Sequence, residues 1–585
     1  MKESTIYRRR ERLRKMTGGS GLGDAYGATI ERIEAQGGDK SGLGMAALMW
    51  ITHAERPLSA DELCHALAVE LGSTNFNGDN VPSVSTLLGC CQGLITVDAE
   101  ASTVRLIHFT LQEYLSTSRE IFSRPHSTMA EICLTCLNSE QVKAAPPYQP
   151  LDILNMPFLT YCSLYWGVHA KRDLSDHAKS LALQLLQKCD GHISVKSLLQ
   201  QAEDWYVWNR GLLPPFSGLH WASFFGIVEI VAALIEMGCY DIDAADFGGR
   251  TPLAWAARNG HGEVVKILLE QGGVDPNKPD DYAETPLALA ASYGHEQEVK
   301  VLLGREEVDP DGPDYWGQTP LSRAAIFGSE GVVKILLGRK EVNPHRPDNT
   351  GTTPFGHASQ RGNKEVVKIL LAYQEVGPDM PDTWDSTPLW HEAAGGDEGA
   401  ASILLKRDEV NPDWPDGAGR TLLSHAASNG HEGVMKILLG SKLVNPDKPD
   451  NRGRTPLSYG AAGGREGTVK ILLVCDEVNP DKLDNYGQSP LFHAALHGKE
   501  GVVKMLLVQE QVNPDQPTLW GQTPISIAAS CGRAGVVEIL LGRQEVAPDK
   551  PDDFGRTPLM HAVSNGHNKV IALLQSRGAL TPSTA

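Results

Sequence analysis

The sequence is dominated by a repeat of 34 residues that runs without insertions. A Thr or Ser recurs at this spacing at positions 251, 285, 319, 353, 387, 421, 455, 489, 523 and 557, and Ser217 extends the register one step upstream. Eleven units, the last one truncated, therefore run from Ser217 to the end and take up more than 60% of the 585 residues. A unit this short cannot bury a core alone, so we expect a solenoid in which each unit packs on its neighbours.

The residues of each unit indicate a helix–turn–helix. In one unit, Thr251–Leu253 is followed by Ala256-Ala257, by Gly260-His261 and by the apolar run Val264–Leu269. Thr caps the first helix, Pro takes the first helical position, and the apolar run gives the second helix one buried face. This pattern resembles the ankyrin repeat, whose TPLHxA, GH and VVxLL signatures recur in nine or more units. The 34-residue period alone would also fit tetratricopeptide repeats, but these residues do not.

A Gly lies nine residues after the Thr or Ser in all eleven units. These are Gly226, Gly260, Gly294, Gly328, Gly362, Gly396, Gly430, Gly464, Gly498, Gly532 and Gly566. The position fits the left-handed end of the first helix, which Gly adopts at the lowest cost. We therefore expect Gly430→Ala to destabilise the fold by about 1 kcal/mol or more.

The connectors between units, called fingers below, are rich in proline. Nine successive units carry Pro 25 positions after the Thr, from Pro276 to Pro548, and eight of them carry a second Pro three residues later. The finger is one residue longer than is usual in ankyrin repeats. Since Pro cannot donate a backbone hydrogen bond, we expect stiff, extended fingers with little strand pairing.

Two positions near each fingertip, between a recurring Asp and the turn Gly, have no structural requirement visible in the sequence. The second of them is aromatic in six of nine complete fingers: Tyr282, Trp316, Trp384, Tyr486, Trp520 and Phe554. Exposed Trp and Tyr are frequent at protein interfaces, so we predict that these residues bind a partner. The alternative is that each ring packs on a neighbouring finger Pro and braces the loop. The pairs ahead of the helix-end Gly are second candidates: Arg258 and Asn259, Ser292 and Tyr293, Ile326 and Phe327, Gln360 and Arg361.

Some units depart from the pattern. Leu422 replaces the helix-start Pro, Glu392 and Gly460 replace the first Ala of their pairs, and Asp385 and Ala283 replace the turn Gly. We expect the units that begin at Thr387 and Thr455 to be the least stable.

The first 216 residues follow another pattern. Helices are expected around 24–35 and 45–54, and Ser59–Glu62 forms a capping box ahead of a helix that runs to Leu71. A short helix to Cys91 precedes two alternating runs, 94–98 and 103–109, which indicate a hairpin, and Thr110–Glu113 caps the next helix. Helices followed by a two-stranded wing indicate a winged-helix domain. The expected fold class is mainly α, with a basic leader at 1–19, a winged-helix domain at 20–125, a helical connector at 126–216 and ankyrin repeats at 217–585.

Four segments of this region also carry a family resemblance. Trp50-Ile51, Ala54–Leu58, His65–Ala68 and Arg105–Leu115 are similar to the winged helix that follows the NACHT nucleotide-binding domain in fungal NLR-like proteins of the STAND class, many of which end in ankyrin arrays. Such segments are also labelled after a GPI inositol deacylase, but we expect no lipase activity. The segment 37–41 is the nearest candidate for a phosphate loop, but Asp39 stands where the last Gly of that motif belongs and Glu34 where the first does, so no nucleotide cofactor is expected.

No motif of the sequence indicates catalysis or a metal site. Cys133 and Cys136 have no second pair at zinc-ligand spacing and are typical of core thiols, and His391-Glu392 lacks the second His of a zinc protease. There is no Gly-x-Ser-x-Gly elbow. Histidines that recur four or ten residues after the Thr are expected to make helix-capping or inter-unit hydrogen bonds. We therefore expect no catalytic, cofactor-binding or metal-ligating residue.

The charge and hydropathy of the chain limit its partners and its location. The formal net charge is -19, and the basic leader leaves an even more acidic body. An acidic body repels phosphate, and the wing at 98–102 has no Lys or Arg, so nucleic acid is not an expected partner. No segment has the apolar length of a membrane span or of a signal peptide, and the ten Cys lack the spacing of a disulfide framework, so we expect an intracellular, cytoplasmic protein.

These observations together predict a non-enzymatic protein of the fungal NLR-like type. Its ankyrin stack would recognise a protein ligand, and its winged helix would relay that event. The finger aspartates suggest a ribbon of negative loops around the aromatic tips, and hence a ligand with a neutral or basic surface. The alternatives are a plain ankyrin scaffold, or the C-terminal part of an ATP-dependent STAND switch whose NACHT domain is missing from this chain.

Overall fold

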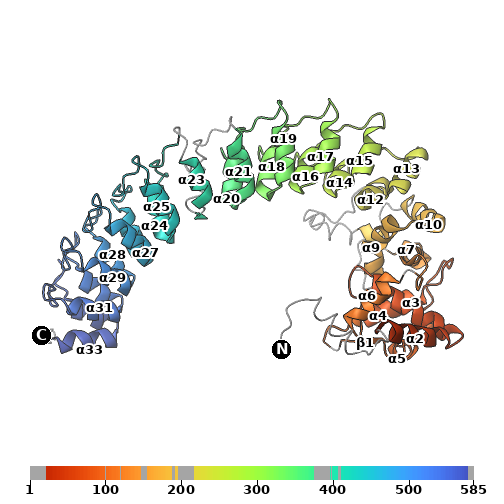
Figure 1. Ribbon diagram of the computed structural model, residues 1–585, viewed down its shortest axis with the longest axis horizontal. Coiled ribbons are helices and arrows are strands. Elements are labelled where there is room, and N and C mark those ends of the chain that lie inside the picture. Colours follow the sequence, from red (N-terminus) through yellow and green to blue (C-terminus); the bar gives the residue numbers. More distant parts are fainter. Residues whose placement is uncertain are drawn as a thin grey trace. The chain divides into compact units, whose positions relative to one another are not determined.

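The structure is a computed structural model that describes residues 22–98, 100–118, 120–145, 155–187, 192–195, 216–373, 395–396, 398–405 and 410–577. The chain divides into two compact units. The first comprises Met1–Ala290 with Gln297–Val308, and the second comprises Ala291–Glu296 with Asp309–Ala585. Successive helix pairs of the repeats stand side by side in chain order within each unit (Figure 1). The basic leader at 1–19 lies outside the described residues.

The N-terminal part of the first unit is a winged helix. Its elements are α2 Leu22–Glu34, α3 Asp39–His53, α4 Ala60–Ala68, the short 3-10 turn η1 Gly78–Asn80, α5 Val84–Cys90, the strands β1 Ile95–Val97 and β2 Val104–Leu106, and α6 Phe109–Thr117. The two strands form an antiparallel hairpin with the register Ile95 to Leu106. Ser59 adds an isolated bridge to Thr103 beside β2, which fastens the wing to the start of α4.

Several details of this domain differ from the sequence-based expectation. α3 begins at Asp39 rather than near residue 45. The capping box of Ser59 and Glu62 is present, but α4 ends at Ala68 rather than at Leu71 because Val69 is extended and the chain then turns through Gly72 at a φ of 83°. The expected cap at Thr110 is wrong. α6 begins one residue earlier, and its cap is His108, whose ring nitrogen accepts the Thr110 backbone N–H at 3.2 Å.

Four further described helices follow the winged helix, and two of them, α9 and α10, pack on the first repeat. They are α7 Pro125–Leu137, α8 Glu140–Lys143, α9 Leu159–Arg172 and α10 Asp176–Leu186. The Trp166 ring of α9 lies edge-on to Trp221 and Phe225 of the first repeat, at centroid distances of 6.1 and 5.2 Å. The Tyr240 hydroxyl donates to the Leu186 carbonyl at 3.0 Å. The connector helices therefore cover the open end of the repeat stack.

The repeats form the helix pairs that their motifs predicted. The pairs comprise α12 Gly218–Phe225, α13 Val228–Glu236, α14 Pro252–Arg258, α15 Gly262–Leu269, α16 Pro286–Ser292, α17 Glu296–Leu303, α18 Pro320–Phe327, α19 Glu330–Leu337, α20 Pro354–Arg361, α21 Lys364–Ala372, α23 Glu398–Leu404, α24 Leu422–Asn429, α25 Glu432–Leu439, α26 Pro456–Gly463, α27 Glu466–Leu473, α28 Pro490–Leu496, α29 Glu500–Leu506, α30 Pro524–Ser530, α31 Ala534–Leu541, α32 Pro558–Ser564 and α33 Asn568–Ser576. Thr319 caps α18 by accepting the Ser322 N–H, and Pro320 opens the helix. The expected fold class, mainly α with a winged-helix domain followed by a solenoid of helix pairs, is confirmed.

The glycines at the ends of the first helices confirm their predicted conformation. All eleven have positive φ, from 69° at Gly362 to 88° at Gly430. The unit from Thr455 keeps both helices although Gly460 replaces Ala, and the Thr468 hydroxyl of its second helix donates to the Ala427 carbonyl of the preceding unit at 3.1 Å. Residues 387–394 at the start of the unit from Thr387 lie outside the described residues, His391 and Glu392 among them, as does Asp385. The expectation that these two units are the least stable stays a prediction.

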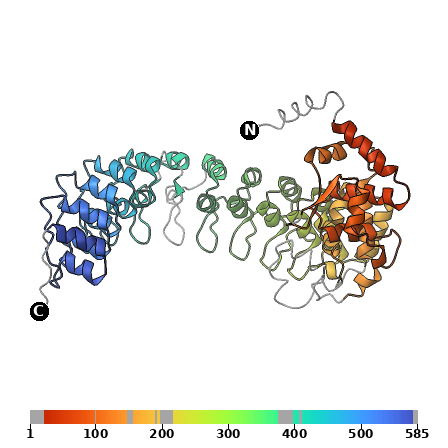
Figure 2. The same ribbon diagram turned by 90° about the horizontal axis from the view of Figure 1, so that it is seen from below.

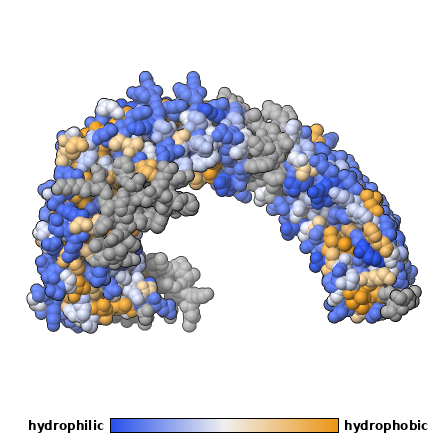
Figure 3. All heavy atoms as spheres, turned by 180° about the vertical axis from the view of Figure 1, so that it is seen from behind, coloured by the Kyte–Doolittle hydropathy of each residue, from blue (hydrophilic) through white to orange (hydrophobic). Residues whose placement is uncertain are grey.

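The core of each unit is apolar, and its surface is mostly hydrophilic. Trp50, Trp166, Trp221 and Trp255 are fully buried in the first unit. Cys133 and Cys136 of α7 lie with Cys162 of α9 in the packed interior, where burial and the neighbouring thiols raise the pKa of Cys162. The face of the C-terminal repeats drawn in Figure 3 carries separate apolar islands in a hydrophilic surround. Among the described helices, none is both long and apolar enough to span a membrane.

Candidate partner-binding site

The recurring Asp of each finger is a structural residue that organises the fingertip. These finger aspartates are Asp246, Asp280, Asp314, Asp348, Asp416, Asp450, Asp484 and Asp552, each only 5–9% exposed. In one finger, Asp450 Oδ1 accepts the backbone N–H groups of Arg452 and Arg454, both at 2.8 Å. The Asp450 N–H in turn donates to the Arg454 carbonyl at 2.9 Å. These three bonds close the loop around the fingertip residue, Arg452.

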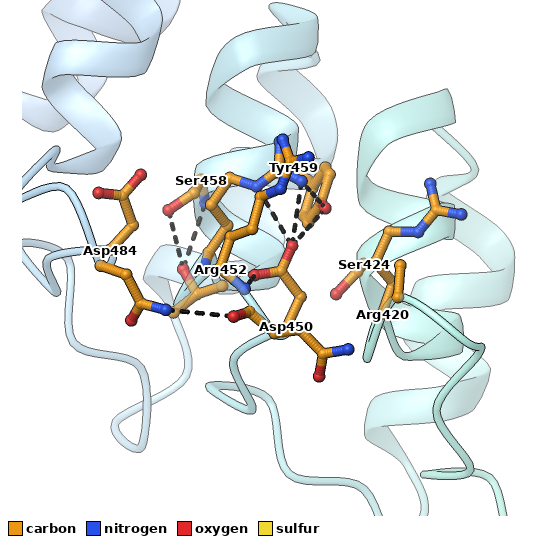
Figure 4. Close-up of polar contacts among 12 residues, drawn as sticks. Arg420, Ser424, Asp450, Arg452, Ser458, Tyr459 and Asp484 are labelled. Carbon is orange, nitrogen blue, oxygen red and sulfur yellow. Dashed lines mark hydrogen bonds and ion pairs between the residues drawn. The ribbon is translucent and has the colours of Figure 1, made fainter.

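The second carboxylate oxygen of a finger Asp receives a donor from the following first helix. Figure 4 shows this arrangement around Asp450, whose Oδ2 accepts the Tyr459 hydroxyl at 2.6 Å. The same contact recurs nine residues apart as His357 to Asp348, His425 to Asp416, His493 to Asp484 and His561 to Asp552, at 2.9–3.2 Å, and as Trp255 to Asp246 at 2.8 Å. The predicted hydrogen bonds of the histidines four residues after the Thr are therefore confirmed.

The histidines ten residues after the Thr make the second predicted kind of bond. His261 Nε2 lies 2.9 Å from the Phe224 carbonyl, and His567 Nε2 lies 3.0 Å from the Ser530 carbonyl, each in the preceding unit. Asn363 and Arg465 occupy the same position and donate in the same way. This inter-unit bond thus depends on a donor at the position and not on histidine.

The electrostatics of the finger Asp reflect this dense set of donors. Burial raises the pKa of Asp450, but the hydrogen bonds from Tyr459 and from the backbone of Arg454 and Arg452 outweigh it, so the pKa lies below its ordinary value. The same balance lowers the pKa of Asp416 and Asp484. For Asp246, Asp280 and Asp314 burial outweighs the donors, and the pKa is raised. All of these carboxylates are covered by the fold. The expected ribbon of exposed negative loops is therefore wrong for the finger aspartates.

A second aspartate in the fingers links neighbouring units. Lys482 Nζ lies 2.9 Å from Asp447 Oδ2 of the preceding finger and donates to the Asp447 backbone carbonyl at 2.8 Å. The same pairing joins Lys278 to Asp243, Arg346 to Asp311, Lys448 to Asp413 and Lys550 to Asp515, at 3.1–3.5 Å. These pairs form a ladder of ion pairs along the fingers, which neutralises much of their charge.

Neighbouring fingertips are also joined by one backbone hydrogen bond each. The Leu519 N–H donates to the Tyr486 carbonyl at 3.0 Å, and the Asp553 N–H donates to the Trp520 carbonyl at 3.1 Å. The described fingers contain no strand, which confirms the expectation of little strand pairing. Figure 2 shows the fingers of successive repeats extending side by side from the ends of the helix pairs.

The described fingertip aromatics differ in how much of each ring reaches the surface. Trp316, Tyr486 and Trp520 are each 43% exposed and Phe554 is 69% exposed, whereas Tyr282 is half-buried. Trp384 lies outside the described residues. Tyr486 and Trp520 stack at a centroid distance of 5.9 Å with an interplanar angle of 18°. Tyr486, Trp520 and Phe554 stand on three consecutive fingers, and we call them the fingertip row.

Sequence reasoning missed the residue just before the aromatic. Leu519 is 67% exposed beside Trp520, and Tyr315 is 72% exposed beside Trp316. The only signal was that both positions of the fingertip vary between units. The second candidate pairs divide: Arg258 and Ser292 are buried, whereas Tyr293, Phe327, Gln360 and Arg361 are exposed and Asn259 and Ile326 are half-buried.

The winged helix carries a separate cleft. A cavity of about 420 Å³ lies between the end of α3, the segment Ala54–Leu58, β2 and the start of α6, and its lining includes Ile51, Pro57 and Phe109. Phe109, which lines the cavity, is 55% exposed, and Ile107, which follows the lining residue Leu106 in the chain, is 49% exposed. The domain therefore presents an apolar surface of its own.

Ligand-type side chains also come together where no motif predicted them. Among the described residues, one group has the spacing of metal ligands: Glu55, His126 and His169. The three come from segments far apart in the chain, so no spacing in the sequence could have indicated them.

Comparison with known families agrees with this geometry. Residues 32–125 match the family described as the winged helix domain of GPI inositol-deacylase, and residues 183–280, 272–348, 401–483, 423–517 and 507–583 match the family described as ankyrin repeats in three copies. A search of the curated proteins found no match. The ankyrin matches together cover more than half of the chain, and ankyrin repeats are protein–protein interaction modules. The chain therefore belongs to the ankyrin-repeat family, with a winged helix domain ahead of its repeats.

Proposed function

We propose that this chain is a non-enzymatic interaction protein of the fungal NLR-like type, which captures a protein ligand on the fingertip row and relays the event through its winged helix. The observation that carries the proposal is the exposure of Tyr486, Trp520 and Phe554 on three adjacent fingers. Large aromatic side chains lose little conformational entropy on binding, and a row of them offers an apolar strip that a protein surface can cover.

Fingers without an aromatic residue support recognition rather than bracing. Ala418 and Arg452 occupy the same fingertip position, and their N–H groups bond to Asp416 and Asp450 at 2.9 and 2.8 Å, just as Tyr486 bonds to Asp484 at 2.9 Å. A small or charged side chain therefore allows the same turn as an aromatic one. This favours recognition over bracing as the reason for the rings.

Contacts within the first unit support the relay. Trp50 of α3 lies edge-on to Phe158 at 5.2 Å, and Gln112 of α6 donates to the Thr52 carbonyl at 2.7 Å. The connector helix α9 then packs on α12 of the first repeat through Trp166. Winged helix, connector and first repeat are thus joined by buried side chains, so a partner that displaces one of them strains the next.

The charge of the protein bears on the kind of ligand. The net charge of -19 favours a protein ligand with a neutral or basic surface, even though the finger aspartates are covered and the finger ladder is paired. The same acidity disfavours nucleic acid as a partner. We place this function inside the cell, in the cytoplasm, where the nine described cysteines, all free, would stay reduced.

The proposal is tested by affinity capture with the full chain. Replacing Tyr486, Trp520 and Phe554 with Ala should remove the ligand without unfolding the array, because no backbone contact of the fingertips uses the rings. A matched control replaces Leu443, Val474 and Val508, apolar residues 67–76% exposed elsewhere on the second unit, with Ala. Equal recovery of every partner by both variants would contradict the fingertip assignment, and loss of the folded state by the first would favour bracing.

The same capture separates a relay from a plain scaffold. Replacing Ile107 and Phe109 with Asp should release a second partner from the winged helix while the fingertip ligand stays bound. If that variant and the parent chain recover the same partners, the scaffold alternative is favoured.

A further inference from the structure

Three ligand-type side chains converge where the winged helix meets the connector. Glu55 belongs to the segment between α3 and α4, His126 opens α7, and His169 lies in the last turn of α9. Their ligand atoms all lie within 4.8 Å of one another. The two Nδ1 atoms are 2.9 Å apart, and Glu55 Oε1 lies 4.0 Å from His169 Nδ1.

The surroundings of this group fix the direction of its side chains. The His169 ring is fully buried, and its other nitrogen, Nε2, lies 2.9 Å from the Tyr161 hydroxyl. The Tyr161 oxygen accepts the Glu55 backbone N–H at 3.0 Å. The His169 ring is thus held between two contacts, with Nδ1 aimed at His126 and toward Glu55.

We propose that Glu55, His126 and His169 form a zinc site that joins the winged helix to the connector. Two imidazoles and one carboxylate are a donor set that Zn²⁺ takes in proteins, with a fourth position left for water. With Zn–N and Zn–O distances of about 2.0–2.2 Å, tetrahedral geometry sets ligand atoms about 3.3 Å apart. The two nitrogens, now 2.9 Å apart, need only separate slightly, and Glu55 Oε1 needs to approach His169 Nδ1 by less than an ångström from its present 4.0 Å.

The neighbours of the site complete its coordination chemistry. When Nδ1 of His169 binds the metal, its Nε2–H donates to the Tyr161 oxygen, which is the kind of outer contact that orients a metal-bound imidazole. Arg172 holds both oxygens of the Glu55 carboxylate: Nη1 pairs with Oε1, and Nη2 donates to Oε2 at 3.1 Å. Oε1 is also the oxygen that lies 4.0 Å from His169 Nδ1, so zinc binding would exchange the Nη1 contact for the metal while Nη2 keeps the carboxylate in place. The Arg172 side chain is 47% exposed, so solvent screens its charge.

Bound zinc would have a mechanical consequence. The three ligands come from the winged helix, α7 and α9, and α9 also packs on the first repeat. A metal that binds only the folded arrangement stabilises it by mass action. The site would thus fasten together the parts of the first unit that the proposed relay uses, although the zinc site does not depend on that relay.

The test is a titration of the metal-free, reduced full chain with ZnCl₂, followed by calorimetry, and with CoCl₂, followed by visible absorption. The parent chain should bind one more equivalent of Zn²⁺ than His126→Gln and give Co²⁺ bands of a site with nitrogen ligands. Replacing a ligand should weaken binding by about 100-fold or more, and Tyr161→Phe by about 10–100-fold. MgCl₂ and CaCl₂, which prefer oxygen ligands, should not compete.

Controls separate this site from loss of folding and from stray zinc binding. His177→Gln changes an exposed histidine of α10 and should bind zinc like the parent chain. Glu55→Gln is a second ligand variant that leaves both histidines in place, and circular dichroism verifies the fold of each variant. Identical zinc stoichiometry and affinity in the parent chain, His126→Gln and Glu55→Gln would overturn the site. Zinc binding without a rise in the unfolding temperature of the parent chain would overturn its role as a clamp.

Discussion

At the scale of single residues, the finger Asp explains most of the finger's geometry. One buried carboxylate satisfies two backbone N–H groups and one side-chain donor, as Asp450 does for Arg452, Arg454 and Tyr459. An unpaired carboxylate buried to this degree would be costly, so the donors and the Asp require each other. Because the carboxylate fixes the backbone, the fingertip side chain is left to vary, and that freedom is what a binding surface needs.

We predict that Tyr459→Phe destabilises the array by about 1.5–3 kcal/mol at pH 7, the usual effect of removing a hydrogen bond to a charged group. The pKa of Asp450 is lower in the folded chain than its ordinary 3.8, so its stabilisation is complete above that value and is lost as the pH falls through the folded pKa. The difference between parent and variant should therefore shrink below about pH 3.8. Urea unfolding of the parent chain and the variant at pH 7 and pH 3 measures the loss of stability and its dependence on pH. Tyr486→Phe, at an exposed fingertip, is the control. An equal difference at the two pH values would contradict the role given to Asp450.

Two positions with left-handed backbone give a second prediction: a substitution at one should lower the stability of the fold, and a substitution at the other should raise it. Gly430 has a φ of 88°, and a Cβ there would lie 3.1 Å from Arg465 Cδ, so Gly430→Ala should cost about 1 kcal/mol or more. Ala283 already has a φ of 60° where other fingers have Gly, so Ala283→Gly should stabilise the fold by about 0.5–1 kcal/mol after the entropy of Gly is subtracted. Thermal unfolding of both variants checks this. Two shifts of the same sign would refute the strain argument.

At the scale of elements, the sequence predicted the helices of the repeats because their signals are local. Thr, Pro and Gly mark the start and end of each first helix, and their preferences depend on backbone geometry rather than on distant contacts. The capping box of Ser59 was found for the same reason. The cap of α6 was missed because Thr110 has the usual capping side chain, whereas His108 caps through a ring nitrogen, which sequence rules do not weigh.

The fingers show where local signals end. Proline predicted extended loops correctly, but the burial of the finger Asp could not be read from the finger itself. It follows from a donor nine residues later, such as His425 or Tyr459. The ion pair of the second aspartate with the next finger, such as Asp447 with Lys482, is equally non-local. The spacing of these residues along the chain does not indicate a contact, because they come together only when the helix pair has folded. The aromatic positions, in contrast, were located by sequence because neighbouring units differ there.

At the scale of the whole molecule, the connector has a role that the sequence did not indicate. A stack of repeats exposes apolar surface at its ends unless a cap covers it. Here α9 and α10 cover the first repeat: Trp166 packs against Trp221 and Phe225, and a Cβ at Gly218 would lie 2.4 Å from the Leu186 carbonyl oxygen. The first unit thus continues from the winged helix into the repeats through packed side chains. An array cut at Ser217 would lose this cover, so binding experiments should use the full chain.

The tightest point of this packing gives the last prediction. Gly167 lies within α9, where Ala is intrinsically better than Gly by about 1 kcal/mol. A Cβ at Gly167, however, would lie 2.1 Å from Phe225 Cγ, in a contact between fully packed elements. We therefore expect Gly167→Ala to destabilise the first unit by about 1–3 kcal/mol, the usual range for overpacking.

A matched substitution separates the cost of overpacking from the gain in helix propensity. Gly42 lies in α3 with nothing within 4 Å of a Cβ, so Gly42→Ala should raise the unfolding temperature by helix propensity alone. Gly167→Ala should cost less stability in a chain that already carries Phe225→Ala than in the parent chain, because the two side chains compete for one space. Thermal unfolding of the parent chain, the two single variants and the double variant measures that coupling. If Gly167→Ala stabilised the protein as Gly42→Ala does, the connector would not be packed on the repeats, and the relay through it would have no physical basis.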